Sequence, residues 1–545
     1  MPERRKVERM EADKIFINGE IITADEQFHV YEALAVQEES ILQTGTNDEV
    51  MKAAGADTEV VDLEGRTLMP GFIDAHAHLE LYGTNILGVD CKQPRSIPEV
   101  LKALKERAVE TPEGCWVRGW GYNQNELAEG RHLTRWDLDK VSTSHPVIVV
   151  RTCGHISCVN SKALEMAGIV ASTPDPPGGA YHKINGQLSG LLLEAAHMTV
   201  FQHADYSEED IMKGLALASQ DFLSYGITSV HDAGGYGTKH IRYLQQAVHK
   251  GIVMQRVFAL YGSLSDAPEM VRAGLESGIS TGLGDDWFRI GPAKLFIDGS
   301  SSGPTCRTRE PYDSSPEDRG ILYLRQHQLD EPLLQAHEHG WQITAHAMGD
   351  EAVDMMLHTI ERALDQKSAA NSRHRIEHAG ITPPDLVERM RQTGAVPVPN
   401  PAFLYEFGDG YETDYGGRVS HMFPLKSYSD HHIPYAVGSD SPITTPNPFY
   451  GLYAAVTRRS KSGRILGENQ ASSLEEVIRA YTWGGAYASH EEHGKGTLEP
   501  GKAADLIILD RSIMNCPVSE LPGIQVETTI LNGKTVYTLQ KEDVY

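Results

Sequence analysis

Residues 67–78 of the chain read TLMPGFIDAHAH, a short apolar run that ends in two histidines. The run has the length and composition of a buried β-strand, and side chains two positions apart on a strand point to the same side. His76 and His78 can therefore reach one cation. The pattern His-x-His is weak by itself, because 24 histidines in 545 residues make chance pairs common. Its place at the end of a strand favours metal binding.

Further runs rich in Val, Ile and Phe follow along the chain, and a helical pattern follows each of them. Most of them start at intervals close to the roughly 30 residues of a βαβ unit. With residues 67–78 they make eight strands, which predict an α/β fold, a (β/α)8 barrel of the TIM type with reactive groups at the carboxyl ends of the strands. The alternative, a doubly wound open sheet, would more often carry a glycine-rich phosphate loop, which we do not find. The runs are GITSVHDAG from Gly226, RVFALYG from Arg256, FRIGPAKLFIDG from Phe288, WQITAHAMGD from Trp341, RHRIEHAG from Arg373, AVPVPN from Ala395 and IPYAVGSD from Ile433.

The two ends of the chain have a different pattern. Short β-rich runs separated by turns fill the first seventy residues, and GTLEPGKAADLIILD and VETTILNGKTVYTL repeat the pattern near the C-terminus. The late ILNGKTVY is similar to the early IFINGEII, which suggests adjacent strands. The sequence therefore predicts one small β domain, built from residues 1–68 and 496–545, and a barrel domain over residues 69–495.

Residues from about 88 to 205 do not follow the barrel repeat. They contain RGWGYNQNEL, RTCGHISCVNSKALEMAGI and the Pro- and Gly-rich TPDPPGGAY. We expect them to form an inserted subdomain after the first barrel strand. Because functional loops gather at the carboxyl ends of barrel strands, the insertion should lie over the site.

The composition excludes several classes of protein. The chain has 49 Lys and Arg against 75 Asp and Glu, a formal net charge of 49 − 75 = −26, so bulk charge argues against a nucleic-acid partner. No apolar run approaches the roughly 18–20 residues of a membrane span, and no apolar signal core follows the first basic residues. We therefore expect a cytoplasmic protein without a membrane partner. The six cysteines are scattered, with no CxxC pair, and suggest neither a disulfide framework nor a zinc ribbon.

Four more polar residues stand at corresponding places in the repeat. Each lies near the end of an apolar run: Lys294 in PAKLFIDG, His346 in ITAHAMGD, His378 in RIEHAG and Asp440 in AVGSDSP. Taken one at a time, a histidine with satisfied core hydrogen bonds or a capping aspartate is the plainer interpretation. Strand ends converge on one cleft in a barrel, however, so the shared position favours one common site.

These motifs together resemble the amidohydrolase superfamily, specifically the YtcJ-like branch that includes N-substituted formamide deformylases. The resemblance covers nearly the whole chain. It rests on MPGFIDAHAH, HISCVNSKAL, KLFIDGS, the strand ends AHAMGD and RIEHA, VGSDSP, and the closing GTLEPGKAADLIILD. It implies a barrel with a β-sandwich made from both termini, and a hydrolytic metal site at the strand ends.

The resemblance also implies the metal ligands. His76 and His78 would bind the more buried metal, and His346 and His378 the more exposed one. The metal would be divalent, zinc in the first place, although histidine and carboxylate ligands also suit Mn²⁺ and Fe²⁺. The resemblance leaves open whether each chain binds one metal or two.

Lys294 would bridge two metals as a carboxylated lysine. A neutral lysine amine adds CO₂ to give a carbamate with two oxygens, and burial near cations favours the neutral amine. The alternative is an unmodified Lys294 paired with Asp298 or another carboxylate, in a site with one metal.

Asp440 would accept a proton from metal-activated water and deliver it to the leaving amine. A bound Zn²⁺ can bring the pKa of water down to about 7, and an aspartate beside that water can act as general base and acid. The alternative is an aspartate that caps the turn before SPITTPNP.

Several neighbours of these positions have plainer interpretations. Asp350 precedes the helical pattern EAVDMMLHTIERAL and is expected to be its N-cap. Glu377 alternates with His378 on its strand and should point away from the cleft. His231 and Asp232 end the second strand, where we expect structural roles.

The insertion supplies the candidate substrate contacts. His155, inside HISCVNSKAL, is the preferred one. Trp120 and Asn123 lie in RGWGYNQN and could line the roof of a pocket, with ordinary packing as the alternative for Trp120. The glycine- and hydroxyl-rich residues 299–310 are either a flap over the site or a plain loop.

The sequence thus predicts a metal-dependent hydrolase that cleaves a carbon–nitrogen bond of a small molecule, an amide such as an N-acyl or N-formyl amine. A deaminase of an aminated heterocycle with one metal is an alternative on the same scaffold. A non-catalytic small-molecule binding protein is a second alternative, disfavoured because all six expected positions are filled. The resemblance also suggests a homodimer.

Overall fold

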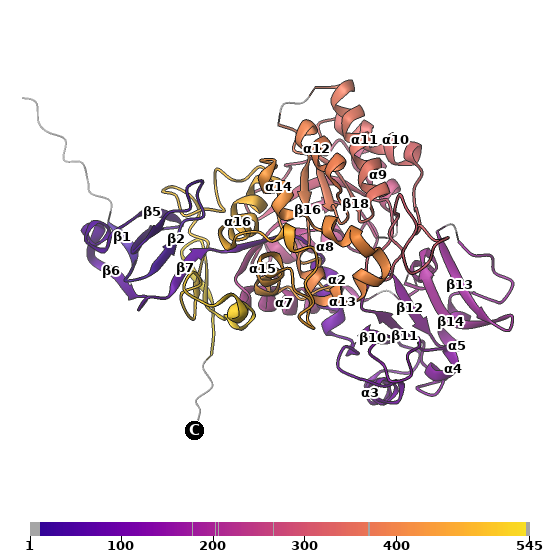
Figure 1. Ribbon diagram of the computed structural model, residues 1–545. Helices are drawn as coiled ribbons and strands as arrows, with labels where there is room; N and C mark the ends of the chain where they lie inside the picture. The colour runs from indigo at the N-terminus through magenta and orange to yellow at the C-terminus, as the bar shows by residue number, and fades with distance from the viewer. Residues whose placement is uncertain are drawn as a thin grey trace, which may run out of the picture.

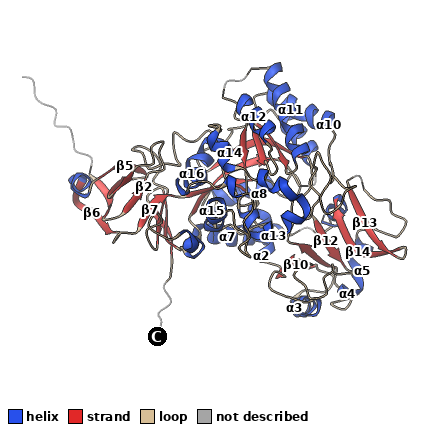
Figure 2. Ribbon diagram, in the orientation of Figure 1, coloured by secondary structure: helices blue, strands red, loops and turns tan. Residues whose placement is uncertain are grey.

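A parallel sheet of seven strands forms the centre of the computed structural model, which describes residues 11–540 apart from 177, 202, 205, 265 and 369–370 (Figures 1 and 2). The strand order is β20-β19-β18-β17-β16-β15-β8, and every neighbouring pair is parallel. All seven strands lie within runs that the sequence predicts as strands, and the predicted α/β barrel is confirmed. Their bounds are β8 (Phe72–Ala77), β15 (Ile227–Asp232), β16 (Arg256–Tyr261), β17 (Phe288–Phe296), β18 (Ile343–Ala347), β19 (Arg375–His378) and β20 (Val396–Val398).

The predicted eighth strand is not a regular strand. Its residues 433–440 nevertheless lie between β20 and β8, because the amide of Ala436 donates to Pro397 and the amide of Ala75 donates to Val437. The segment runs very close to β8: a Cβ on Gly438 would lie 2.5 Å from the amide nitrogen of His76. This contact and a φ of 57° at Asp440 interrupt regular pairing, yet the segment closes the ring.

Barrel strands are buried on both faces, and their side chains divide between two environments. On β18, Ile343 and Ala345 join the apolar cluster shared with the surrounding helices. Thr344 and His346 alternate with them and face the interior, where Thr344 donates to the Glu377 carboxylate. The interior is therefore polar, and the apolar residues attach the strands to the helices.

Helices follow the strands and cover the barrel (Figure 2). They are α2 (Leu79–Ile86), α7 (Glu208–Ser224), α8 (His240–His249), α9 (Ala267–Glu276), α10 (Gln326–Glu338), α11 (Asp350–Gln366), α12 (Pro384–Thr393), α13 (Ala402–Tyr415), α14 (Leu425–Asp430), α15 (Pro448–Thr457), α16 (Leu474–Arg479) and α17 (Gly485–Ala488).

Strands from both ends of the chain share one six-stranded sheet, β23-β22-β21-β7-β2-β3, beside a four-stranded sheet, β5-β4-β1-β6 (Figure 1). An apolar cluster that includes Phe16, Leu34 and Leu506 draws on both sheets. A buried ion pair between Arg256 and Asp505 (2.7 Å) ties this region to the barrel. The elements are β1 (Ala12–Ile17), β2 (Glu20–Ile22), β3 (Val30–Tyr31), β4 (Ala33–Gln37), β5 (Ser40–Gly45), α1 (Asn47–Val50), β6 (Ala54–Asp62), β7 (Thr67–Pro70), β21 (Leu506–Leu509), β22 (Val526–Leu531) and β23 (Lys534–Thr538).

The chain between β8 and β15 builds a second six-stranded sheet, β13-β14-β12-β11-β10-β9, at the opposite end of the molecule in Figure 1. Two apolar clusters hold this sheet to its helices. The elements are β9 (Val89–Asp90), α3 (Ile97–Glu110), β10 (Val117–Tyr122), α4 (Arg135–Leu138), β11 (Val147–Arg151), β12 (Ile156–Val159), α5 (Ser161–Met166), β13 (Gly179–Ile184), β14 (Gln187–Glu194) and α6 (Ala195–Phe201).

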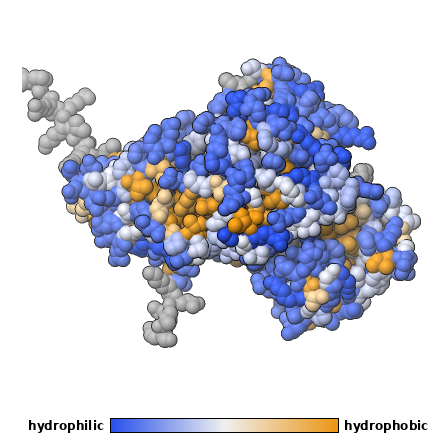
Figure 3. Space-filling model, viewed as in Figure 1, coloured by the Kyte–Doolittle hydropathy of each residue, from blue (hydrophilic) through white to orange (hydrophobic). Residues whose placement is uncertain are grey.

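The surface is mainly hydrophilic on the face shown in Figure 3, and the apolar residues visible there gather toward the middle of the molecule. Among the helices of the described residues, none has the length and apolar character needed to cross a membrane.

Two glycines allow α2 to pack directly on α7. A Cβ on Gly83 would lie 2.2 Å from the carbonyl oxygen of Gly214, so the two backbones meet without side chains between them. Because α2 begins one residue after His78, this contact helps to fix the end of β8.

We expect Gly83→Ala to destabilise the fold by about 1–3 kcal/mol, since the added methyl group overpacks the α2–α7 contact. Gly410→Ala, at an exposed position of α13, is the matched control: its Cβ meets nothing within 4 Å, and alanine should be neutral or slightly stabilising there. Urea unfolding of both variants measures the difference. If the two variants had the same free energy of unfolding, α2 and α7 could move apart with little loss of stability.

Candidate metal centre

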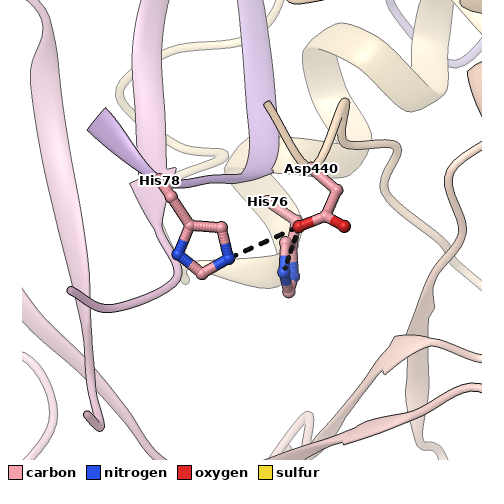
Figure 4. A group of neighbouring side chains, drawn as sticks. All are labelled: His76, His78 and Asp440. Carbon is pink, nitrogen blue, oxygen red and sulfur yellow. Dashed lines mark ion pairs between the residues drawn. The ribbon is translucent and has the colours of Figure 1, made fainter. Parts of the chain in front are cut away.

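Two histidines and an aspartate meet in a buried cluster at the end of the barrel (Figure 4). His76 lies near the end of β8 and His78 follows the strand directly, so both rings point to the same side, as the spacing predicts. Asp440 arrives on the closing segment, where its amide donates to the His76 carbonyl (2.6 Å). Its Oδ1 lies 3.4 Å from Nε2 of each imidazole. One ligand atom from each residue lies within 4.8 Å of the others, so the three can hold one cation.

His378 and His346 extend this cluster. The His378 ring lies between those of His76 and His346, with centroid separations of 4.7 and 4.5 Å. Lys294 is fully buried beside them and interacts electrostatically with His378 and Asp440. All six residues that the sequence assigns to the site are thus together in space.

Each histidine of the cluster uses one ring nitrogen to bond a protein oxygen and keeps the other for the cleft. Such contacts orient imidazoles that bind metals. The contacts are His76 Nδ1 to Glu377 Oε2 (2.5 Å), His78 Nδ1 to the Gly234 carbonyl (2.5 Å), His378 Nδ1 to Asn400 Oδ1 (2.7 Å) and His346 Nε2 to the Gly299 carbonyl (3.0 Å). Nε2 of His76 is buried without a hydrogen-bond partner. This orphaned nitrogen and the set of four imidazoles, one lysine and one carboxylate fit a divalent metal.

Three of the histidines, His78, His346 and His378, are held in the form that binds metals. Burial lowers the pKa of His378 to about 3 and holds the pKa of His346 well below its ordinary value. Burial also lowers the pKa of His78, although the hydrogen bond with Asp440 opposes this. A neutral imidazole can bind a metal without first releasing a proton.

Glu377 points into the barrel, which corrects the expectation that it points away from the cleft. Its carboxylate lies between His76 and the buried guanidinium of Arg375, which bonds both carboxylate oxygens (2.8 and 2.9 Å). From Arg375 to Glu377, the side chains alternate between the two faces of β19, as in a regular strand. His378 breaks this alternation, because a φ of 67° turns that residue into the cleft at the end of β19. Burial would raise the pKa of Glu377, but Arg375 and His76 hold it well below its ordinary value.

Residues at the end of β15 contact neighbours of the proposed ligands and help to position the site. His231 Nδ1 contacts the Arg375 guanidinium (2.9 Å), and Asp232 accepts from the amide of Leu79, one residue after His78 (2.9 Å). His240 bridges the carboxylates of Asp232 (2.6 Å) and Glu80 (2.5 Å). Burial would lower the pKa of His240, but the two carboxylates raise it to about 10. The sequence gives no signal for His240, because it starts a helix away from any strand end.

Lys294 is not paired with Asp298, the partner that the sequence analysis left open. Its Nζ donates to the carbonyl of Ala233 (2.8 Å), and among the described residues it has no carboxylate within 4.0 Å. Burial lowers its pKa to about 8. Asp298 instead accepts from the amides of Met348 and Gly349 (2.9 and 2.8 Å).

Asp440 is not the turn cap that the sequence analysis left open, because its carboxylate faces two imidazoles. The next helix, α15, has Asn447 as its N-cap, whereas the Asp440 carboxylate faces His76 and His78. Burial would raise the pKa of Asp440, but these two histidines hold it well below its ordinary value. The residue is therefore held as a carboxylate.

Asp350 is the first residue of α11 and not its N-cap, which is Gly349. The Asp350 carboxylate accepts instead from the amide of Arg309 (2.9 Å). The expected capping role is wrong because the helix begins one residue earlier than its sequence pattern suggests.

The cluster opens into a cavity of about 350 Å³ between the barrel and the chain that connects β8 to β15, which we term the inserted segment. His155 lines it, as expected of a substrate contact. Trp120 packs in an apolar cluster of the inserted segment and Asn123 lies in a turn beside Glu126, so the structure brings neither to the cavity wall. The wall consists of His76, His78, Leu81, Cys153, Gly154, His155, Glu194, Ala195, His197, Met198, Thr199, Tyr236, Ser263, Leu264, Ala267, Pro268, Phe296, Tyr323, Leu324, His346, His378, Asp440 and Ile443.

His155 is held by two residues that sequence reasoning missed. Its Nδ1 lies 2.9 Å from Glu194 Oε2, and the Tyr323 hydroxyl donates to the same carboxylate oxygen. Burial would lower the pKa of His155, but Glu194 raises it to about 9. Glu194 and Tyr323 lie outside the recognised motifs, and only folding brings them to His155.

Comparisons with known proteins find similar sequences and a similar fold. The model of the amidohydrolase family matches residues 59–537. An N-substituted formamide deformylase of Arthrobacter pascens is 30% identical, over 96% of this chain and 98% of its own. The putative amidohydrolase YtcJ of Bacillus subtilis is also 30% identical, over 96% of this chain and 99% of its own. The crystal structure of an uncharacterised metal-dependent hydrolase from Pyrococcus horikoshii OT3 superposes with a TM-score of 0.76 at 27% identity, covering 93% of this chain and 99% of its own.

We expect Glu377→Gln to weaken zinc binding by about 10- to 100-fold, because the amide no longer accepts a charge-assisted hydrogen bond from His76. Competition with a chromophoric chelator measures the affinity. Glu388→Gln, which alters an exposed carboxylate on α12, is the control and should bind zinc like the wild type. Unchanged affinity in a folded Glu377→Gln protein would contradict the assigned role.

Proposed function

Since the chain belongs to the amidohydrolase family, it is a hydrolase that acts on carbon–nitrogen bonds, and we propose that it cleaves a small-molecule amide, an N-acyl or N-formyl amine. The observation that carries this proposal is the convergence of four histidines and an aspartate on one cavity wall at the strand ends, with Lys294 buried beside them. The name of the Arthrobacter pascens relative supports an N-substituted formamide as the substrate class.

A divalent metal, zinc in the first place, is the cofactor that we infer. His76 and His78 would hold one ion, and His346 and His378 a second. When bound, such a metal polarises the substrate carbonyl and brings the pKa of a water molecule down to about 7. The orphaned Nε2 of His76 supports this assignment, because a metal would satisfy it.

We infer that Lys294 would carry a carbamate, an anion whose two oxygens could serve both ions. Three features support it: full burial, the lack of a carboxylate partner among the described residues, and a position beside His378 and Asp440. Burial also favours the neutral amine, the form that adds CO₂.

Asp440 is the proposed general base and acid. Its carboxylate faces Nε2 of both His76 and His78, so a water molecule bound beside this cluster would lie within reach of a carboxylate oxygen. Asp440 takes the proton from that water as its oxygen attacks the carbonyl carbon, then gives the proton to the amine nitrogen as the C–N bond breaks. His76 and His78 orient the carboxylate.

We further infer that residues 1–68 and 496–545 form a β-sandwich domain and that residues 88–205 are a subdomain inserted into the barrel. Apolar clusters confined to these parts support the division. On this division the inserted subdomain supplies His155 as a substrate contact.

We expect Asp440→Asn to reduce kcat by at least about 100-fold, because asparagine cannot take up the proton. Release of amine from a panel of N-formyl and N-acetyl amines by zinc-loaded protein measures the effect. Asp385→Asn on exposed α12 is the control and should keep kcat within about twofold. Near-normal turnover of Asp440→Asn would contradict the assignment, and ammonia release from aminated heterocycles instead of amides would favour a deaminase.

We expect about two metals per chain when the protein is produced with zinc and bicarbonate, and about one in Lys294→Met, which cannot form a carbamate. Elemental analysis gives the metal content, and a ¹³C signal after growth with labelled bicarbonate reports the carbamate. Two metals in Lys294→Met would refute the bridging role. One metal and no ¹³C signal in the wild type would show an unmodified lysine.

A further inference from the structure

The inserted segment places His155 close to the barrel histidines on the cavity wall. The His155 ring centroid lies 6.1 Å from that of His346, and a quarter of the His155 side chain is exposed. Nδ1 is already bonded to Glu194, so Nε2 is the ring nitrogen left for a ligand. The inserted segment therefore meets the metal centre at His155.

Glu194 is built to hold this ring. Its carboxylate is 1% exposed, and its backbone amide donates to the His155 carbonyl (2.9 Å), so the two residues are joined through both main chain and side chain. A φ of 53° turns Glu194 at the end of β14, in the left-handed region that a glutamate seldom adopts. Tyr323, from the loop after β17, donates to the same carboxylate and links the pair to the barrel.

Apart from the metal ions inferred above, the cavity wall offers little other positive charge. Among the described residues that line it there is no lysine and no arginine. The buried Glu194 carboxylate, 2.9 Å from Nδ1, stabilises a positive charge on the His155 ring. The protonated ring presents an N–H donor to the cavity while Glu194 balances its charge.

Amide hydrolysis creates a need for such a donor. As the water oxygen bonds to the carbonyl carbon, the π electron pair of the carbonyl moves to its oxygen, which becomes an oxyanion. Donors positioned at that oxygen stabilise the transition state more than the ground state. The electron pair returns when the C–N bond breaks and the nitrogen takes the proton from Asp440.

Building on the proposed function, we propose that His155 is a catalytic residue that donates a hydrogen bond from Nε2 to the substrate carbonyl oxygen as it becomes an oxyanion, with Glu194 as the residue that positions it. His155 keeps its own proton throughout. The inserted segment thus completes the reaction centre as well as covering it.

Kinetics separate this role from a structural one. In zinc-loaded protein assayed with N-formyl and N-acetyl amines, His155→Gln should lower kcat by about 100- to 1000-fold and change KM less than about threefold. Glu194→Gln should lower kcat less, by about 10-fold, with unchanged zinc content. His182→Gln, an exposed position on β13 of the same segment, is the control and should match the wild type. A His155→Gln protein with wild-type kcat overturns the proposal and leaves the proposed function standing.

A binding experiment tests the same contact without turnover. Methylphosphonate is a stable tetrahedral anion that mimics the oxyanion, and calorimetry on zinc-loaded protein gives its affinity. We expect His155→Gln to bind it at least 10-fold more weakly than the wild type and His182→Gln to bind it equally well. If the wild type hydrolyses no amide yet shows this difference, the proposed function fails while the anion contact of His155 is supported. Equal binding by His155→Gln and the wild type, or no binding by the wild type, overturns the proposal.

Discussion

The pairing of Arg375 with Glu377 inside the barrel is the interaction on which the rest of the site depends. The guanidinium bonds both oxygens of Glu377, the carbonyl of Ala75 and Nδ1 of His231, so β19 is tied to β8 and β15. Glu377 in turn holds Nδ1 of His76. A buried charge is tolerated only when it is paired and fully hydrogen-bonded, so each partner fixes the other.

This polar interior explains how the strand ends can carry so many ionisable groups. Apolar residues on the outer faces, such as Ile343 and Ile376, attach the strands to the helices and leave the inner faces free. Below the cleft, the inner faces of the strands are filled by Arg375, Glu377 and the groups that these two residues contact. At the strand ends, the inner faces carry the four imidazoles, and one ring nitrogen of each imidazole is bonded to a protein oxygen. The barrel therefore supplies rigidity and ligands, whereas the inserted segment supplies the opposite wall with His155 and Glu194.

Much of this could be read from the residues because the signals are local. The seven strands follow from short apolar runs, and the spacing of His76 and His78 places both rings on one side of β8. Prediction failed where a single backbone angle decided the outcome. A positive φ at His378 turned the ring into the cleft, so Glu377 could face inward with Arg375. A positive φ at Asp440 and the close approach of Gly438 to β8 made the eighth segment irregular.

The sequence alone determined the α/β barrel, the family and the six residues gathered at the strand ends, because periodicity, motif and strand position are properties of short stretches of chain. Only the tertiary structure decided which partner each group meets: Lys294 with the Ala233 carbonyl in place of Asp298, His240 between Asp232 and Glu80, and Glu194 with Tyr323 behind His155. These contacts join residues far apart in the chain, or residues whose orientation depends on how separate elements pack. Hydrogen bonds and pKa values follow from that packing, which no local pattern encodes.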